Sequence, residues 1–130
     1  MSPLKPGQQL DWEQHGLASI RPVHPDHAHS DLGNARRLLD RHVDLIYVMQ
    51  VGWHVWDTTR WRPDLTGEVK RRMSKVCDEL LLDALDLGDG DRRKAAIQHA
   101  LSSQSARRID AALELAKTDD RLSWKRRVDI

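Results

Sequence analysis

Arginine interleaved with tryptophan is the feature of this sequence with the clearest potential chemistry. Arg60 and Arg62 flank Trp61, in a stretch that holds three of the five tryptophans of a chain without phenylalanine. Tryptophan rings can stack on the bases of a single strand while nearby cations contact its phosphates. Alternatively, Trp53, Trp56 and Trp61 belong to the core, and the cations occupy an ordinary solvated surface. The candidate contacts for nucleic acid or a protein partner are Arg60, Arg62, Lys70, Arg71, Lys75, Arg92, Arg93, Arg107 and Arg108.

Other residue groups offer weaker chemistry. Histidines within residues 24–29 could bind zinc or nickel, but Pro25 and the lack of a predicted scaffold favour a solvated linker. Ser102 and Ser103 lie near His99, but no strained turn is predicted that would expose a nucleophilic serine. The sequence contains no glycine-rich nucleotide-binding motif. We therefore expect no catalytic residue, no enzymatic activity, no metal and no cofactor.

Composition limits the classes of protein that this chain can represent. Its 130 residues predict one folded domain. The net charge of +1 comes from 21 basic and 20 acidic side chains, so attraction to nucleic acid would have to come from local clusters. The single cysteine, Cys77, allows no intrachain disulfide and fits a reducing compartment. Without a long apolar run or signal peptide, we expect a soluble cytoplasmic protein that does not bind membranes.

A small sheet should position the tryptophans. Residues 53–56 alternate in the period-two pattern of a half-buried strand, and residues 60–62 repeat this pattern after a short polar break. Residues 45–49 are rich in β-branched side chains and predict a preceding strand. Together the three segments predict an antiparallel meander that ends in a hairpin.

Two turns fit the polar break in this hairpin. A two-residue loop would place Asp57 opposite Arg60, and their ion pair would close the turn. The two central threonines do not favour positive φ, so a four-residue loop built on a type I turn is the alternative. Both turns place Trp56 opposite Trp61.

Helices should pack on this sheet. Ser30 or Asp31 can cap the first predicted helix, and Asp64 or Thr66 can cap the second. The fold class that follows is α+β, mainly helical, with a small antiparallel meander packed on helices. Apolar side chains recur with helical spacing in residues 31–43, 69–85, 91–101 and 106–116.

The chain divides into three parts by composition. Residues 1–30 are rich in proline, glycine, glutamine and histidine and predict a partly disordered N-terminal arm. Residues 31–118 carry the helical and strand patterns and form the predicted domain. Residues 119–130 predict a loosely structured C-terminal tail.

The hairpin and the helix after it resemble the D5 N-terminal-like domain of phage and plasmid primase-helicases. The resemblance covers about residues 31–118 and is most specific at Trp53, Trp56, Asp57 and Trp61, its structural signature. In one respect the chain differs, because the family commonly has Asp-Gly in the turn where this chain has Asp57-Thr58. Further matching residues are Val55, Arg60, Pro63, Asp64, the segment 66–69, the segment 31–36 and the segment 99–109.

The resemblance implies a role in the replication of mobile genetic elements inside a bacterial host cell. In the family, this domain usually lies just before a superfamily 3 helicase motor, which this sequence does not contain. The implied function is a non-catalytic module that binds DNA or docks protein partners beside a primase-helicase. The alternative is a stand-alone phage inhibitor or decoy, of the anti-CRISPR type, that binds a host defence complex.

Overall fold

The computed structural model describes residues 27–88 and 90–122. Most of the predicted arm, including His24, and the last part of the predicted tail lie outside these residues. Along the described chain the elements are α1 (Asp31–Arg41), β1 (Leu45–Val48), β2 (Gly52–Trp56), β3 (Trp61–Pro63), α2 (Glu68–Leu85), α3 (Asp91–Ser103), α4 (Ala106–Ala116) and the short 3-10 helix η3 (Asp120–Leu122).

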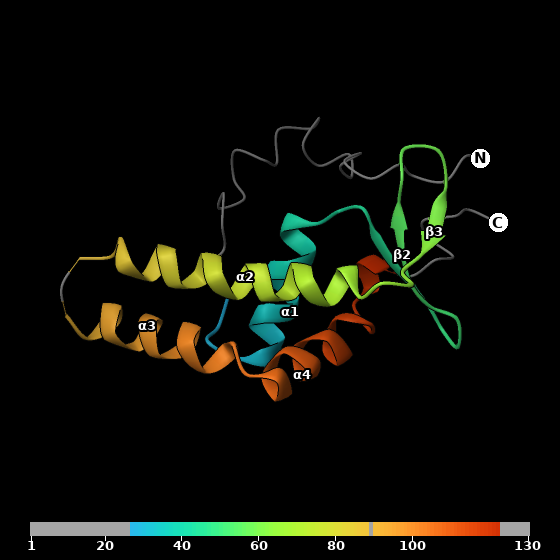
Figure 1. Ribbon diagram of the computed structural model, residues 1–130. Coiled ribbons are helices and arrows are strands. Elements are labelled where there is room, and N and C mark those ends of the chain that lie inside the picture. The colour runs from blue at the N-terminus through green and yellow to red at the C-terminus, as the bar shows by residue number, and fades with distance from the viewer. Residues whose placement is uncertain (1–26, 89, 123–130) are drawn as a thin grey trace.

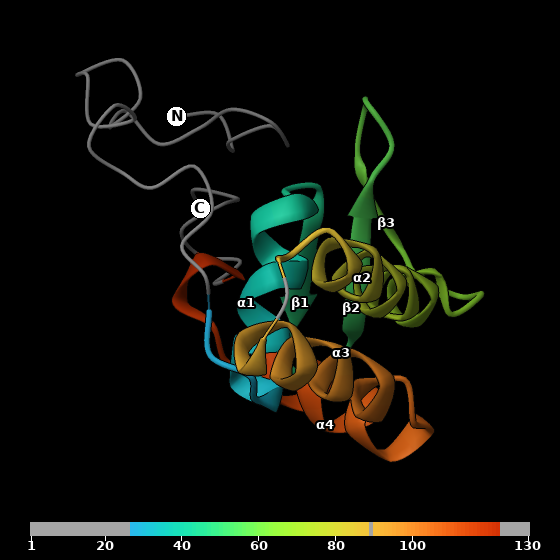
Figure 2. The same cartoon turned by 90° about the vertical axis from the view of Figure 1, so that its left-hand side faces the viewer.

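The helices pack on one another and on one face of the sheet. α2 and α3 lie side by side in antiparallel directions, and their far ends extend away from the strands (Figures 1 and 2). α1 packs against α2 and α4. This arrangement confirms the predicted α+β class with mainly helical content. No helix in the part of the chain that the structure describes is long and apolar enough to cross a membrane.

The sheet has the strand order β1-β2-β3, with both neighbouring pairs antiparallel, which confirms the predicted meander. Leu45 pairs with Val55, and Tyr47 pairs with Trp53. Because alternate strand residues point to opposite faces, these four side chains share one face of the sheet. Leu45 and Val55 are buried in the core, and the two aromatic rings pack against it. The sheet thus contributes one apolar face to the helical core.

The main hydrophobic core is built from α1, α2, α4 and the sheet. Leu38 and Met73 are fully buried within it, and each such side chain contributes about 1.5–3 kcal/mol by leaving water. No described side chain of α3 belongs to this cluster. The cluster contains Ala35, Leu38, Leu39, Leu45, Val55, Val69, Met73, Val76, Cys77, Ile109, Ala112, Leu113, Ala116 and Leu122.

One helix start follows the predicted chemistry, and another differs from it. Ser30 Oγ accepts a hydrogen bond of 3.0 Å from the Gly33 N–H, which confirms one of the two predicted caps for α1. α2 begins after Gly67, whose φ of 79° lies in the left-handed region, so neither Asp64 nor Thr66 occupies the cap position. The Asp64 carboxylate nevertheless accepts from the N–H groups of Thr66, Glu68 and Val69. Asp64 therefore accepts hydrogen bonds from the first N–H groups of α2, although it lies before the cap residue of that helix.

Three element boundaries differ from the sequence prediction. α1 ends at Arg41, and α3 continues to Ser103. The extension of α3 is possible because Ser102 Oγ donates to the His99 carbonyl within the helix, so the serine does not interrupt it. Residues 119–122 are not loosely structured, since η3 places Leu122 in the core with 2% of its surface exposed.

Candidate interaction surface

The three hairpin tryptophans pack against aromatic neighbours. Trp56 and Trp61 pair across β2 and β3 with ring centroids 5.3 Å apart and an interplanar angle of 65°. Trp53 meets Tyr47 with the same 5.3 Å separation at 72°. Such edge-to-face pairs add about 0.5–1.5 kcal/mol to area burial. All three rings are half-buried. This geometry is the one expected if the tryptophans stabilise the hairpin and do not stack on bases.

The turn at the hairpin tip is organised by Asp57. Its Oδ1 accepts from the Thr59 N–H at 3.0 Å and from the Arg60 N–H at 2.9 Å. These two backbone bonds, followed by a bond from the Thr59 hydroxyl, lower the pKa of Asp57 to about 2. The strands leave four residues between them, but Thr58 has a φ of 83°, so the alternative built on a type I turn is wrong. Arg60 forms the expected ion pair with Asp57, at 3.6 Å.

Arg62 connects the hairpin to α2. Its Nη2 donates to Glu68 Oε1 at 2.8 Å, and Arg72 donates to the other oxygen of Glu68 at 2.5 Å. Arg72 also donates to Asp44 Oδ1 at 2.5 Å, between α1 and β1. The two arginine hydrogen bonds hold the pKa of Glu68 below its ordinary value. Arg62 therefore serves this network, and its guanidinium is only partly available to a partner.

Three further cations from the predicted set are bonded within the domain. Lys70 lies 2.9 Å from Asp110 of α4, and Arg108 lies 2.7 Å from Asp31 of α1. Arg71 donates to the Thr66 carbonyl at 2.7 Å. The first two contacts join neighbouring helices, and the third lies at the start of α2.

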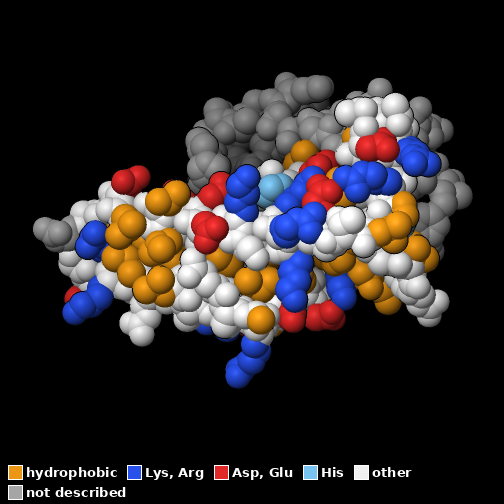
Figure 3. All heavy atoms as spheres, in the orientation of Figure 1, with side chains coloured by type: hydrophobic (Ala, Val, Ile, Leu, Met, Phe, Trp, Pro, Cys, Tyr) orange, Lys and Arg blue, Asp and Glu red, His pale blue; other side chains and the backbone are white. Residues whose placement is uncertain are grey.

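The remaining predicted cations are Lys75, Arg92, Arg93 and Arg107, which form no ion pair with the described residues. Arg92 and Arg93 are neighbours in the first turn of α3 but line different hollows of the surface. Lys75 lies on α2 and Arg107 on α4. In Figure 3 the blue cations are dispersed among acidic and apolar side chains. The structure therefore does not assemble the nine predicted contacts into one continuous strip.

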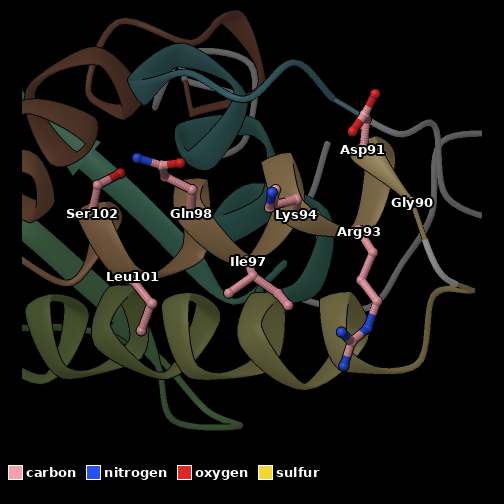
Figure 4. Close-up of a pocket in the computed structure, with 8 residues that line it drawn as sticks. All are labelled: Gly90, Asp91, Arg93, Lys94, Ile97, Gln98, Leu101 and Ser102. Atoms are coloured by element: carbon pink, nitrogen blue, oxygen red, sulfur yellow. The ribbon is translucent and has the colours of Figure 1, made fainter.

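An open hollow of about 860 Å³ runs along α3, and we call it the α3 groove. Leu101 is 53% exposed in it, and Leu85 of the neighbouring α2 is 47% exposed. Figure 3 shows apolar side chains gathered over the far half of the α2–α3 hairpin, and Figure 4 shows the groove itself. The lining residues are Gly90, Asp91, Arg93, Lys94, Ile97, Gln98, Leu101 and Ser102.

A buried polar cluster joins α1 to α3 on the other side of that helix. His99 Nε2 lies 2.9 Å from Asn34 Oδ1, and Asn34 Nδ2 donates to Ser103 Oγ at 2.9 Å. Arg37 donates to the same Asn34 oxygen at 2.9 Å. Burial, and then the neighbouring charges of His29 and Arg37, lower the pKa of His99 to about 4. The cluster thus holds a neutral imidazole in a structural hydrogen-bond network.

The family of the chain follows from comparison with known protein families. The model named D5 N terminal like matches residues 35–130. The chain belongs to this family. No curated protein and no solved structure matches it. The D5 N terminal-like match confirms the predicted resemblance and associates the chain with a replication module that accompanies primase-helicases.

Sequence reasoning missed the polar cluster of this D5 N terminal-like domain. His99 and Ser103 lie one helical turn apart on the buried face of α3, and this spacing was the available signal. Their partner Asn34 is 65 positions before His99, so no local pattern connects them. Cys77 is 1% exposed, and burial raises the pKa of its thiol.

A second hollow of the D5 N terminal-like domain, of about 750 Å³, lies among α1, α2 and α3. Arg41 lies 3.6 Å from Glu79 and 3.5 Å from Asp83 across it. His27 contacts Asp40 at 2.6 Å, and His29 stacks on His99 with centroids 4.8 Å apart. In the described part of the chain, no three histidine, cysteine or acidic side chains are grouped to hold a metal ion. Cationic and carboxylate side chains both line this hollow, so it has no marked preference for either charge.

Proposed function

We propose that this D5 N terminal-like domain is a non-catalytic docking module that binds a protein partner beside a primase-helicase. Membership of the family supports the replication setting. The observation that carries docking is the α3 groove, which leaves Leu101 about half exposed on a helix that contributes nothing to the main core. Apolar surface rimmed by polar side chains is typical of protein interaction sites.

The distribution of charge favours a protein partner over nucleic acid. Arg62, Lys70 and Arg108 are paired with carboxylates inside the domain. A cation that binds a phosphate would have to give up such a pair, which reduces the gain from neutralising the phosphate. The tryptophan rings pack edge to face with their neighbours, so they present no parallel platform for bases.

The proposal assigns no catalytic step to the chain. The neutral His99 is bonded to Asn34 and Ser103, and Ser103 is fully buried. A nucleophile or general base must reach the reacting atoms, and these side chains face one another inside the domain.

The test is to mix the full chain with the primase-helicase encoded by the same replicon and to measure complex formation by sedimentation velocity. We expect a complex that survives raised salt, because apolar contact is not screened by ions. Electrophoretic shifts with single-stranded and double-stranded DNA, and an ATPase assay of the chain alone, complete the experiment.

Three outcomes would overturn the proposal. A DNA shift that falls steeply with salt, without a protein complex, would assign the domain to nucleic acid. ATP hydrolysis by the isolated chain would make it an enzyme. Binding to a host defence complex, with no affinity for replication proteins, would support the inhibitor alternative.

A further inference from the structure

α3 is attached to the domain differently from the other three described α-helices. Its buried face consists of His99, Ala100 and Ser103, which are small or polar. Its larger apolar side chains, Ile97 and Leu101, line the α3 groove instead of entering the main core. An ordinary surface helix turns its apolar stripe inward. α3 therefore keeps Ile97 half-buried beside α2 and leaves Leu101 about half exposed.

The groove has the shape of a helix-packing surface. Arg93, Ile97 and Leu101 form one row at four-residue spacing, and the second row contains Lys94, Gln98 and Ser102. Figure 4 shows the first row on the side of α3 that faces α2 and the second row on the opposite side. Such rows are the ridges between which the side chains of another helix insert.

α2 extends the apolar part of this surface. Gln104 donates to Asp78 at 3.1 Å, so these two residues lie side by side and set the register of the antiparallel helices along their axes. Leu85 is seven residues after Asp78, and Ile97 is seven residues before Gln104, so the two apolar side chains lie at the same level. A helix in the groove would therefore contact apolar groups from both α2 and α3.

The two ends of the groove differ in charge. At the Gly90 end, Arg93 and Lys94 form no ion pair with the described residues and face one carboxylate, Asp91. Gly90 provides no side-chain cap for the first N–H groups of α3, and the positive end of the helix dipole adds to the potential there. No charged side chain lines the Leu101 end. A complementary occupant is therefore acidic at one end and apolar along its length.

We infer that the α3 groove binds an amphipathic helix of a partner protein, with the acidic end of that helix over Arg93 and Lys94. This inference rests on the proposed docking function and names its surface and the chemistry of its partner. Leucine-type side chains at positions i, i+4 and i+7 of the partner helix fill the apolar part. Carboxylates at one end meet the two cations of α3 and fix the orientation.

The probes are two fluorescein-labelled amphipathic peptides of about 16 residues, long enough for helix formation. Both carry leucines at the same helical spacing, but one has glutamates and the other has lysines at one end. Fluorescence anisotropy with the full chain should show at least about fivefold tighter binding of the glutamate peptide at low ionic strength, and a smaller difference at high salt. Carbodiimide coupling should join a peptide glutamate to Lys94 and leave Lys75 unmodified.

Matched variants locate the site. Leu101→Asp should weaken binding by about tenfold or more, because it places a charge on the apolar row. Leu82→Asp is the control, since Leu82 is 63% exposed on α2 but does not line the groove. Both positions are exposed, so both variants should keep the fold, and circular dichroism melts check this. Arg93→Ala with Lys94→Ala should abolish the preference for glutamate.

The inference fails if the two peptides bind equally or if Leu101→Asp binds like the unchanged chain. It also fails if single-stranded DNA displaces the peptide, or if Leu101→Asp converts a dimer of the chain to monomer, because the occupant would then be DNA or a second copy. A primase-helicase complex that is insensitive to Leu101→Asp would leave the docking function intact and reject the groove. Peptide binding without a primase-helicase complex would confirm the groove and reject the function.

Discussion

Asp57 and Arg60 close the β2–β3 turn through two different kinds of acceptor. The Asp57 N–H donates to the Arg60 carbonyl at 3.0 Å, whereas the Arg60 N–H donates to the Asp57 side chain at 2.9 Å. The carboxylate takes the place of the backbone carbonyl that accepts in a regular two-residue hairpin. The turn conformation therefore depends on Asp57, and Thr58 is held at a φ of 83°.

Replacing Thr58 with glycine should stabilise the domain. A β-branched residue in the left-handed region costs about 1–2 kcal/mol, and glycine removes this cost while adding some freedom to the unfolded chain. We expect Thr58→Gly to raise the free energy of unfolding by about 0.5–1 kcal/mol in urea titration. Thr59→Gly is the control and should lower it, because the Thr59 hydroxyl donates to Asp57. A destabilised Thr58→Gly protein would contradict the turn geometry.

The same turn should contribute a pH dependence to stability. The pKa of Asp57 is lowered from 3.8 to about 2, so the folded state favours the carboxylate. Its stabilising contribution is therefore present above the unfolded pKa and is lost as the pH falls from about 4 to 2. Melting temperatures of the unchanged chain and of Asp57→Asn should be compared across this range. Their difference should shrink toward pH 2, and a constant difference would show that the carboxylate charge is unimportant.

Local patterns were sufficient to predict much of this fold. The alternation around Trp53 and the polar break before Trp61 determine a hairpin, and both considered turns give the Trp56–Trp61 pair that the structure contains. The apolar spacing of α2 similarly specifies which side of that helix is buried. These features depend on residues close together in the chain.

The surface chemistry depended on distant residues and could not be predicted in the same way. Arg108 was expected to face a partner, but it pairs with Asp31, which is 77 positions away. Sequence spacing gives no information on such a pair. The partial exposure of Leu101 is similarly hidden, because its burial depends on where α2 and α4 lie.

His99 should make the domain less stable in mildly acidic solution. Burial lowers its pKa from 6.5 to about 4, so the folded state disfavours the protonated imidazole. This contribution to stability is present above pH 6.5 and is lost as the pH falls from 6.5 toward 4, because the unfolded chain binds the proton first. The measurement is an NMR titration of the His99 ring together with unfolding at each pH. A midpoint near 6.5 in the folded protein would contradict the buried network.

His99→Gln provides a variant without this titration. Its amide can donate toward Asn34 Oδ1, so the loss of stability at neutral pH should stay within about 1–2 kcal/mol. Its stability should change less than that of the unchanged chain between pH 6.5 and 4. His54 is the control, since among the described residues its ring bonds to the Gly52 carbonyl on β2, outside the polar cluster, and His54→Gln should keep the original pH profile. If His99→Gln retains that profile as well, another group causes the acid sensitivity.

Arg72 should be the most sensitive surface cation in the domain. It donates to both Asp44 and Glu68 at 2.5 Å, and its side chain is 19% exposed. Arg72→Met would leave Asp44 without its cation and should destabilise the domain by about 1–3 kcal/mol. Lys75→Met lies one helical turn away on α2, forms no ion pair with the described residues and should change stability by less than about 0.5 kcal/mol. A double-mutant cycle with Asp44→Asn isolates the pair, and a coupling near zero would mean that this contact does not hold β1 to α2.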